Sequence, residues 1–417
     1  MQTTNQTYKH IVILCCISLL IEGIVYIATP LVFHSFVDMW SFKVYFETIV
    51  IPFATNGSLP YINYFWEYPI LMTVPVFISI IPVFATGNPY TFSTAFPILM
   101  TICNLVVTAL VYILTLKIYQ NGKRAFIAGF LYATAFTAAY ITLTNFDPMP
   151  TMLMMLGLTL TVYGTDKLKS AGYLAYILGF FTKIYPVAIL PFLVLFNAKK
   201  SSLKEEIVSV VKIGIIPFLI LFVPIYLINP AMIDTYIIKN AASKQIFVSS
   251  FVYTVYGWLH FIIGLPVTET FVANIMSVIL AGIILFLLYL AYMNPEQDAI
   301  FLLQLTLIAL VAVIACSKYH SPQYMLWFMP ILCILIAGDL TKMGIFYLLQ
   351  IIWYIKFPLT FWKLWSNGYY TQPLPTPGGI TALIFFTIEY AILFYLVWRV
   401  SLSEWEWFIP LRAGRKI

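Results

Sequence analysis

Residues 69–86, PILMTVPVFISIIPVFAT, decide how this chain is threaded through a membrane. The stretch is apolar enough to cross a bilayer, but Pro69, Pro75 and Pro82 recur about every second helical turn. Proline bends a helix because it lacks an N–H and its ring clashes with the preceding turn. A bent helix suits the membrane interface better than a straight span. We therefore predict that residues 69–86 lie along the outer surface.

The distribution of basic residues supports the same topology. If residues 69–86 do not cross, thirteen basic residues share one side with Lys9, and every arginine is among them. They are Lys117, Lys123, Arg124, Lys167, Lys169, Lys199, Lys200, Lys204, Lys342, Arg399, Arg412, Arg415 and Lys416. The positive-inside rule makes this side cytoplasmic. If the stretch crossed, the loop holding Asp38 would lie across the membrane from Lys183 and His320.

The composition excludes a soluble protein. Of 417 residues, 62% are hydrophobic and only 9% are charged, with a mean hydropathy of +0.94, whereas a globular protein carries roughly 25% charged residues. At about 20 apolar residues per span, we predict an all-α integral membrane protein, a polytopic bundle of about 12 transmembrane helices. The apolar runs lie near 10–32, 95–116, 125–144, 149–165, 171–184, 185–197, 207–228, 270–292, 299–316, 322–337, 343–356 and 380–398. The net charge of +6 comes from the short loops and does not indicate a nucleic-acid partner.

We expect one transmembrane domain over residues 1–417, with both termini in the cytoplasm and a basic tail at 400–417. A large first outer loop at 33–94 would contain interfacial helices. Further outer segments are expected near 145–148, 229–269, 317–321 and 357–379. The inner loops are short, so any chemistry belongs on the outer face.

Three of the acidic residues in these outer segments are candidate site residues. Asp38 follows the first span and is either a solvated carboxylate or a general base at a cavity mouth. Glu67 precedes Pro69 at a helix start, where an acid suits the helix dipole. Asp147 stands before Pro148, as an N-cap does, and a binding role is compatible with capping. Charged groups near membrane depth mark function by default.

Cationic groups fall in two other outer segments. Lys183 lies where two short apolar runs meet at Pro186, and a lysine in such a break can bind an anion or merely snorkel. Residues 317–324, SKYHSPQY, gather a lysine, an imidazole, phenols and hydroxyls between two spans. A carboxylate facing such cations suits transfer of a group from a phosphate leaving group. No H-E-x-x-H, G-x-x-x-x-G-K or CxxC pattern occurs, so zinc hydrolysis and ATP-driven pumping lack support.

These segments resemble the C-type (GT-C) integral-membrane glycosyltransferases, and most closely glycosyltransferase family 87, the polyprenol-phosphate-mannose-dependent mannosyltransferases. The matching elements are Asp38 with Tyr45, FWEYPIL at 65–71, Phe146 with Asp147, GFFTKIYP at 179–186, and SPQYMLWFMP at 321–330. They run in the family's order over about 38–330. The chain departs from the pattern at Ile70, where a second proline is usual.

The resemblance implies an inverting transfer of a sugar, mannose in that family, from a polyprenyl phosphate to an acceptor hydroxyl, without metal or cofactor. Asp38 would be the catalytic base. The lipid phosphate would be bound by Lys183, His320, Lys318 and Tyr324. The sugar or acceptor would be bound by Asp147, Glu67, Tyr68 and Tyr45. The acceptor, whether glycolipid, glycan or protein, is left open, and so is the linkage.

Two alternatives stay open. Protein O-mannosyl- and aminoarabinose-type transferases share the fold but typically carry adjacent acids in the first loop and larger soluble insertions. A lipid flippase or secondary transporter should show broken helices at corresponding positions of two halves, whereas one obvious break is found here, near Pro186. The expected location is a prokaryotic plasma membrane, with the active site on its outer face.

Overall fold

The computed structural model describes residues 4–33, 44–232, 246, 250–294, 298–360, 374 and 376–402. Every named element within these residues is a helix, and they contain no strand. Six helices are long and apolar enough to cross a membrane, or seven if one bent pair counts as a span. The prediction of an all-α integral membrane protein is therefore confirmed. The predicted residue Asp38 and the end of the predicted basic tail lie outside the described residues.

The six long helices are α1 (Thr4–Phe33), α5 (Phe92–Tyr119), α11 (Leu203–Ile228), α14 (Glu269–Met293), α15 (Ala299–Cys316) and α19 (Pro377–Val397). Shorter α-helices are α3 (Ile51–Asn56), α4 (Thr73–Thr86), α6 (Gly122–Ala133), α7 (Phe136–Thr144), α8 (Pro148–Tyr163), α9 (Asp166–Thr182), α10 (Leu190–Ala198), α13 (Phe251–Gly257), α16 (Met325–Ile336) and α17 (Leu340–Tyr354). Short 3-10 or π segments are η1 (Phe46–Val50), η2 (Ile70–Met72), η3 (Pro89–Thr91), η4 (Tyr185–Ala188), η5 (Trp258–Ile262), η6 (Pro322–Tyr324), η7 (Ile355–Thr360) and η8 (Trp398–Leu402). Because several expected spans are helices of 10–17 residues, the count of about twelve stays a prediction.

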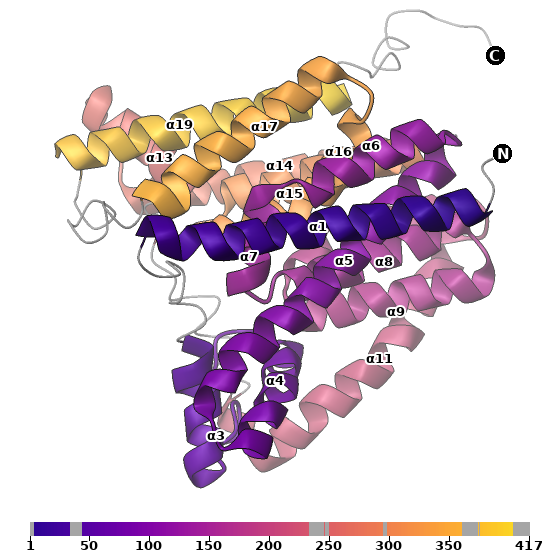
Figure 1. The fold of residues 1–417 in the computed structure, drawn as a ribbon. Helices are drawn as coiled ribbons and strands as arrows, with labels where there is room; N and C mark the ends of the chain where they lie inside the picture. The colour runs from indigo at the N-terminus through magenta and orange to yellow at the C-terminus, as the bar shows by residue number, and fades with distance from the viewer. Residues whose placement is uncertain are drawn as a thin grey trace, which may run out of the picture.

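The centre of the bundle is formed by α15 and α16. All residues of α16 are buried, and so are most residues of α15. A helix that is apolar on every side belongs in the interior of a bundle. In Figure 1 α1 runs along one side of the bundle, where it packs against α5, α6 and α7.

The pair α8 and α9 packs closely because both helices carry glycine at the contact. A Cβ at Gly157 would lie 2.9 Å from the carbonyl oxygen of Gly172. Small residues allow this approach between helices in membranes. Gly164 ends α8 in the left-handed region, at φ +78°, which a side chain would disfavour. The turn that follows returns the chain antiparallel along α9, and this pairing places the ends of α8 and α9 beside each other.

One expected span differs from the structure, and one expected outer segment contains a helix. The predicted span at 125–144 is not one helix, because α6 and α7 are bent by 51° at their junction. The predicted outer segment 229–269 contains a helical stretch, Phe251–Ile262, formed by α13 and η5. Thr134 and Ala135 separate α6 from α7, and the Thr134 hydroxyl donates back to the carbonyl of Phe130. Such back-bonding often bends helices.

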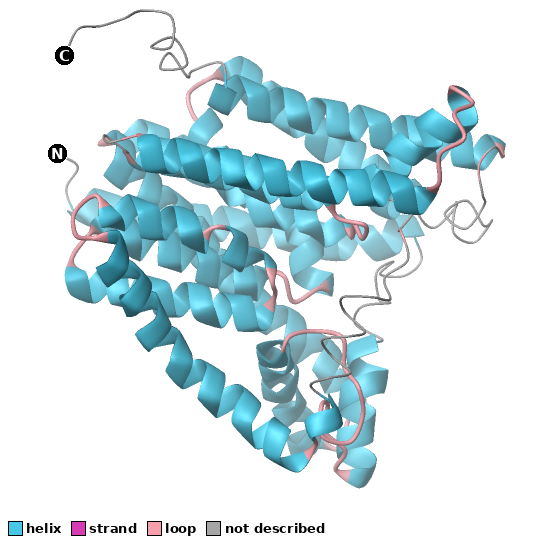
Figure 2. Ribbon diagram, turned by 180° about the vertical axis from the view of Figure 1, so that it is seen from behind, coloured by secondary structure: helices cyan, strands magenta, loops and turns pink. Residues whose placement is uncertain are grey.

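Residues 69–86 form η2 and α4. The 14 residues of α4 reach only about 21 Å, less than the roughly 30 Å of a bilayer's hydrocarbon core. The helix packs with the segment 44–56 and the start of α5 in a separate hydrophobic cluster. This lobe lies below the main bundle in Figure 1, and α11 runs diagonally from the bundle toward it (Figures 1 and 2). An interfacial position for α4 agrees with its length and stays a prediction.

Candidate active site

A break between α9 and α10 positions Lys183, as the sequence predicts. The last residue of α9 is Thr182, and Lys183 has an extended backbone at φ −158° and ψ 142°. Pro186 then lies in the 3-10 turn η4. Because Pro186 has no N–H to donate to the carbonyl four residues earlier, that of Thr182, and its ring clashes with that carbonyl, the helix cannot continue from α9 into α10. The side chain of Lys183 therefore does not continue the surface of α9.

The partner of Lys183 is the carboxylate of Asp147, at the start of α8. The Lys183 ammonium donates to both carboxylate oxygens at 2.7 Å. The indole N–H of Trp327 donates to Oδ1 of the same carboxylate at 2.6 Å. The Asp147 side chain is fully buried, and that of Lys183 is 10% exposed. Asp147 makes no side-chain capping bond to α8, so its carboxylate is used to hold Lys183 rather than to cap the helix.

Aromatic rings surround this ion pair. The Lys183 ammonium lies 4.8 Å from the ring centre of Phe146, 5.2 Å from that of Tyr324 and 5.3 Å from that of Trp327. Trp327 is itself stacked between Tyr185, at 4.1 Å, and Tyr324, at 3.9 Å. Cation–π contacts of this kind are stronger where water is excluded. The stack therefore restricts the position of the ammonium from several sides.

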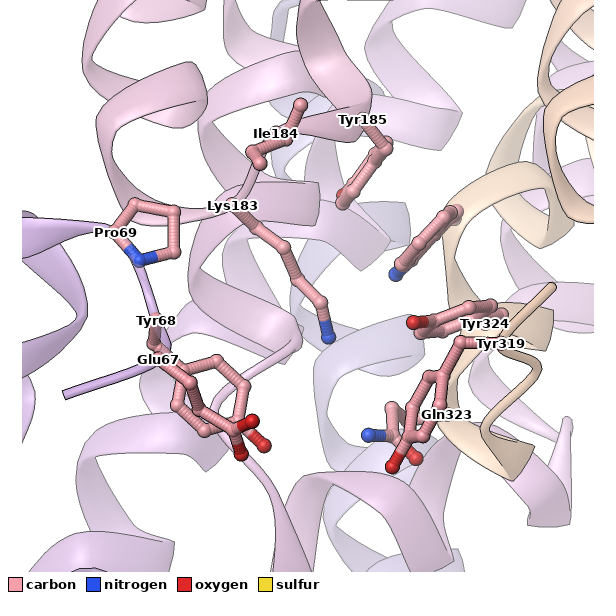
Figure 3. A pocket seen from close by; sticks show the side chains of 10 residues that line it. Glu67, Tyr68, Pro69, Lys183, Ile184, Tyr185, Tyr319, Gln323 and Tyr324 are labelled. Carbon is pink, nitrogen blue, oxygen red and sulfur yellow. The ribbon is translucent and has the colours of Figure 1, made fainter. Parts of the chain in front are cut away.

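A cavity of ≈ 130 Å³ opens in front of Lys183. Figure 3 shows the lysine pointing into it, between Glu67 and Tyr68 on one side and Tyr319 and Tyr324 on the other. It is lined by Glu67, Tyr68, Pro69, Lys183, Ile184, Tyr185, Tyr319, Gln323, Tyr324 and Trp327. At about 30 Å³ per water molecule, it has room for a phosphate-sized group and is too small for a whole glycolipid. Three chain segments far apart in sequence thus meet around one cation.

The predicted site residues divide into two groups. Glu67, Tyr68, Lys183 and Tyr324 line the cavity together. The others among the described residues do not line it. They are Asp147, behind Lys183; Tyr45, whose hydroxyl donates to the Asn145 side chain at 3.1 Å; His320, buried; and Lys318, exposed.

Burial affects the pKa of a cavity tyrosine and that of His320 in opposite directions. Burial is the main reason why the pKa of Tyr68 lies well above 10, so its hydroxyl stays protonated. Burial, with a smaller contribution from the ammonium of Lys356, holds the pKa of His320 well below 6.5. The imidazole packs edge-on against Tyr324 at 5.6 Å between ring centres and shares a hydrogen bond of 3.1 Å with the Tyr390 hydroxyl. The structure thus places a neutral imidazole behind Tyr324, where the sequence predicts a cationic donor.

A second, apolar groove adjoins the cavity. It has a volume of ≈ 880 Å³ and lies between α9, η4, α10 and α11. Pro69 and Ile184 belong to the walls of both the groove and the cavity. Side chains on its walls such as Ile184 and Phe218 are about half exposed, so the groove opens toward the lipid side of α11. The resemblance implies a groove for a lipid tail, but the sequence alone does not identify the residues of its walls, because three separate helices create it.

The sequence analysis also did not name the charged residues that lie inside the predicted spans. Glu22 of α1 accepts hydrogen bonds from Thr101 at 2.6 Å and Asn104 at 2.8 Å. Lys356 and Glu389 form a buried ion pair. The rule that ionisable residues within spans are costly would have identified them if applied inside the apolar runs as well as at their ends. Among the described residues, no group of three His, Cys, Asp or Glu side chains is arranged to hold a metal ion.

Comparisons with known proteins give limited information. No protein-family model matches the chain, and no curated protein matches it. A solved structure that is similar is the crystal structure of ArnT from Cupriavidus metallidurans bound to undecaprenyl phosphate. The identity is 14%, the alignment covers 93% of this chain and 77% of that chain, and the TM-score is 0.48. The function proposed below is therefore argued from the cavity and the groove, and not from this similarity.

Proposed function

We propose that this chain is a membrane glycosyltransferase. It transfers a sugar from a polyprenyl-phosphate-linked donor to an acceptor hydroxyl on the extracytoplasmic face. The observation that carries the proposal is the position of Lys183, which lies in a polar cavity whose wall continues, through Pro69 and Ile184, into an apolar groove. A lipid phosphate needs this combination of an anion site and a hydrocarbon site in direct contact.

The groove fits a long hydrocarbon chain. Along α11 it runs from Val210 to Tyr226, which at 1.5 Å per residue is about 24 Å. This length is about four fifths of a roughly 30 Å hydrocarbon core. Its walls are almost entirely apolar and open to the bilayer, so a polyprenyl tail can enter sideways from the lipid phase. The phosphate end of that tail would lie at the level of Ile184.

The cavity fits the phosphate and the reacting end of the sugar. Lys183 is held in place by Asp147 before any ligand binds, so little reorganisation is needed when charge develops on the leaving group. The protonated hydroxyls of Tyr68 and Tyr324 can donate to phosphate oxygens. Glu67, on the facing wall, is an acceptor for sugar or acceptor hydroxyls. Lys318 and His320 are proposed to act from outside the cavity.

The transfer inverts the anomeric carbon. Asp38 takes the proton from the acceptor hydroxyl as its oxygen forms a bond to the anomeric carbon. The bond from that carbon to the phosphate oxygen breaks, and its electron pair leaves with the lipid phosphate. One carboxylate is enough because a phosphate is a good leaving group and needs no general acid, unlike the alcohol in glycoside hydrolysis. Mannose is the sugar we propose, from the resemblance to family 87.

The experiment is a transfer assay with purified protein, synthetic polyprenyl-phosphate-linked hexoses and glycolipid, glycan and peptide acceptors. We expect transfer by the wild type and a loss of at least about a hundredfold for Asp38→Asn, the usual scale for a general base. The control is Glu47→Gln, which neutralises an exposed acid of the same loop. Full turnover by Asp38→Asn would remove Asp38 as the base. Wild-type protein that moves lipid phosphates across vesicles without transferring sugar would instead identify a flippase.

A further inference from the structure

A buried ion pair lies outside the proposed reaction. Lys356 stands at the end of the helix formed by α17 and η7, just before Phe357 turns extended. Its ammonium donates to Glu389, near the middle of α19, and also lies 4.7 Å from the ring centre of Phe386. Both side chains of the pair are at least 96% buried. Pairing only partly offsets the cost of removing two charges from water, so a pair at membrane depth calls for a functional explanation.

The two helices that carry this pair also hold one loop. Trp353, one turn before Lys356, donates its indole N–H to the carbonyl of Pro322 at 3.2 Å. Tyr390, the residue after Glu389, shares its hydroxyl with Nδ1 of His320 at 3.1 Å. The loop 317–324 is therefore attached to α17 at one point and to α19 at another. The ion pair joins the two helices directly beside both attachment points.

The opposite side of the same loop forms a wall of the cavity. Tyr319, Gln323 and Tyr324 face the cavity. Tyr324 packs against His320 on one side and stacks on Trp327 on the other. Any shift of the loop against α17 or α19 therefore moves Tyr324 relative to Lys183.

We infer that Trp353, Lys356, Glu389 and Tyr390 form a clamp that positions the loop 317–324, and with it Tyr324, against the cavity. These are positioning residues, because they act on the ligand site only through the loop. The Lys356–Glu389 bond sets the separation and register of the two helices, since a shift along either axis would leave two buried charges unpaired. An apolar contact would tolerate such a shift. The expected effect of the clamp on binding of the polyprenyl-phosphate donor rests on the proposed function. Its expected effect on the order of the loop 317–324 does not.

The test replaces the ion pair by an apolar pair, Lys356→Met with Glu389→Leu, and compares it with the charge-swapped variant, Lys356→Glu with Glu389→Lys. Hydrogen exchange reports the order of residues 317–324 in every variant. The transfer assay reports the KM for the polyprenyl-phosphate donor. A matched control, Lys169→Met with Glu206→Gln, removes a second ion pair of 2.8 Å between α9 and α11.

We expect the apolar variant to exchange the amides of 317–324 roughly tenfold faster than wild type. Its donor KM should rise roughly ten- to a hundredfold with a smaller change in kcat, because a displaced Tyr324 no longer donates to the donor phosphate, and hydrogen bonds to charged groups contribute on that scale. The charge-swapped variant should restore both quantities, and the control should leave both unchanged. An ion pair that only stabilised the fold would not change loop exchange and donor KM together in this way.

Wild-type exchange and wild-type KM in the apolar variant would overturn the inference. If that variant does not fold, Tyr390→Phe decides the matter, since it removes one hydroxyl from the clamp and should still accelerate exchange at 317–324. Unchanged exchange in a folded Tyr390→Phe protein would equally overturn it. If the wild type shows no sugar transfer, the proposed function fails, while the exchange data still decide for or against the clamp.

Discussion

The substitution Lys183→Met separates the structural role of the lysine from its role at the ligand site. It leaves the fully buried carboxylate of Asp147 with the Trp327 indole and without its cation. Methionine fills a similar volume, so the perturbation is mainly electrostatic. The companion variant, Lys183→Met with Asp147→Asn, also removes the carboxylate charge and keeps an oxygen that can accept from Trp327.

The magnitude follows from the geometry. Two unit charges at the observed 2.7 Å attract by about 6 kcal/mol at an effective dielectric constant of 20. The cost of desolvating both groups offsets part of this attraction, and removal of one partner of a buried pair typically destabilises by about 3–5 kcal/mol. We take the lower end, about 3 kcal/mol, because the cavity leaves the lysine side chain 10% exposed. Scaled to a chain of this length, that is a Tm decrease of roughly 3–6 °C.

The catalytic effect should be larger and should not recover. Loss of a preorganised charge at a leaving group typically costs about 10²–10³ in kcat. We expect both variants to lose transfer activity by this factor, while the double variant returns to within about 1 kcal/mol of wild-type stability. The measurements are thermal unfolding in detergent and the transfer assay. If the single variant kept the wild-type turnover, our assignment of Lys183 to the phosphate would fail, whatever its Tm.

Two further predictions concern neighbouring parts of the site. His320 has a lowered pKa in the folded protein, so its neutral form stabilises the fold fully above about pH 6.5. Below that value the free energy of unfolding should fall by up to about 1.4 kcal/mol per pH unit. The variant His320→Gln should remove this part of the acid dependence, measured as the Tm between pH 7.5 and 5. Gly214→Leu should narrow the groove, because a Cβ there would lie 3.3 Å from Ile177. Since a displaced tail still lies in lipid and loses only packing, the rate with a long-chain donor should fall roughly three- to tenfold, and the control Gly282→Leu, in open space on α14, should have no effect.

The fold class could be predicted because it depends on averages over many residues. Long apolar runs with few charges have no stable alternative to a bundle in lipid. Local bends could not be predicted in the same way. The 51° bend between α6 and α7 arises at Thr134 and Ala135, and neither position is a proline or a glycine. Hydropathy therefore showed one continuous run where the structure has two helices.

The candidate site could be predicted in part, for a reason that is also physical. Lys183, Glu67 and Tyr324 stand near prolines or at ends of apolar runs, where the few polar residues of this chain are easily noticed, and they meet around one cavity. The pairing of Asp147 with Lys183 could not be foreseen, because the two are 36 positions apart and their contact depends on how closely α8 packs against α9.

The ionisable residues that the sequence analysis missed lie inside the apolar runs, and they include the ion pair of Lys356 and Glu389. Lys356 and Glu389 lie 33 positions apart on different helices, and each is embedded in an otherwise apolar stretch. Hydropathy treats a single charge in such a stretch as a small defect, whereas the energetic cost of burying it alone would be prohibitive. A buried ionisable residue therefore needs a partner, either an opposite charge, as for Lys356 and Glu389, or neutral hydrogen-bond donors, as for Glu22. The ionisable residues of predicted spans are the place to look for such partners. Applied to this chain, that rule joins α17 to α19, and the two helices carry the attachment points of the loop that faces Lys183.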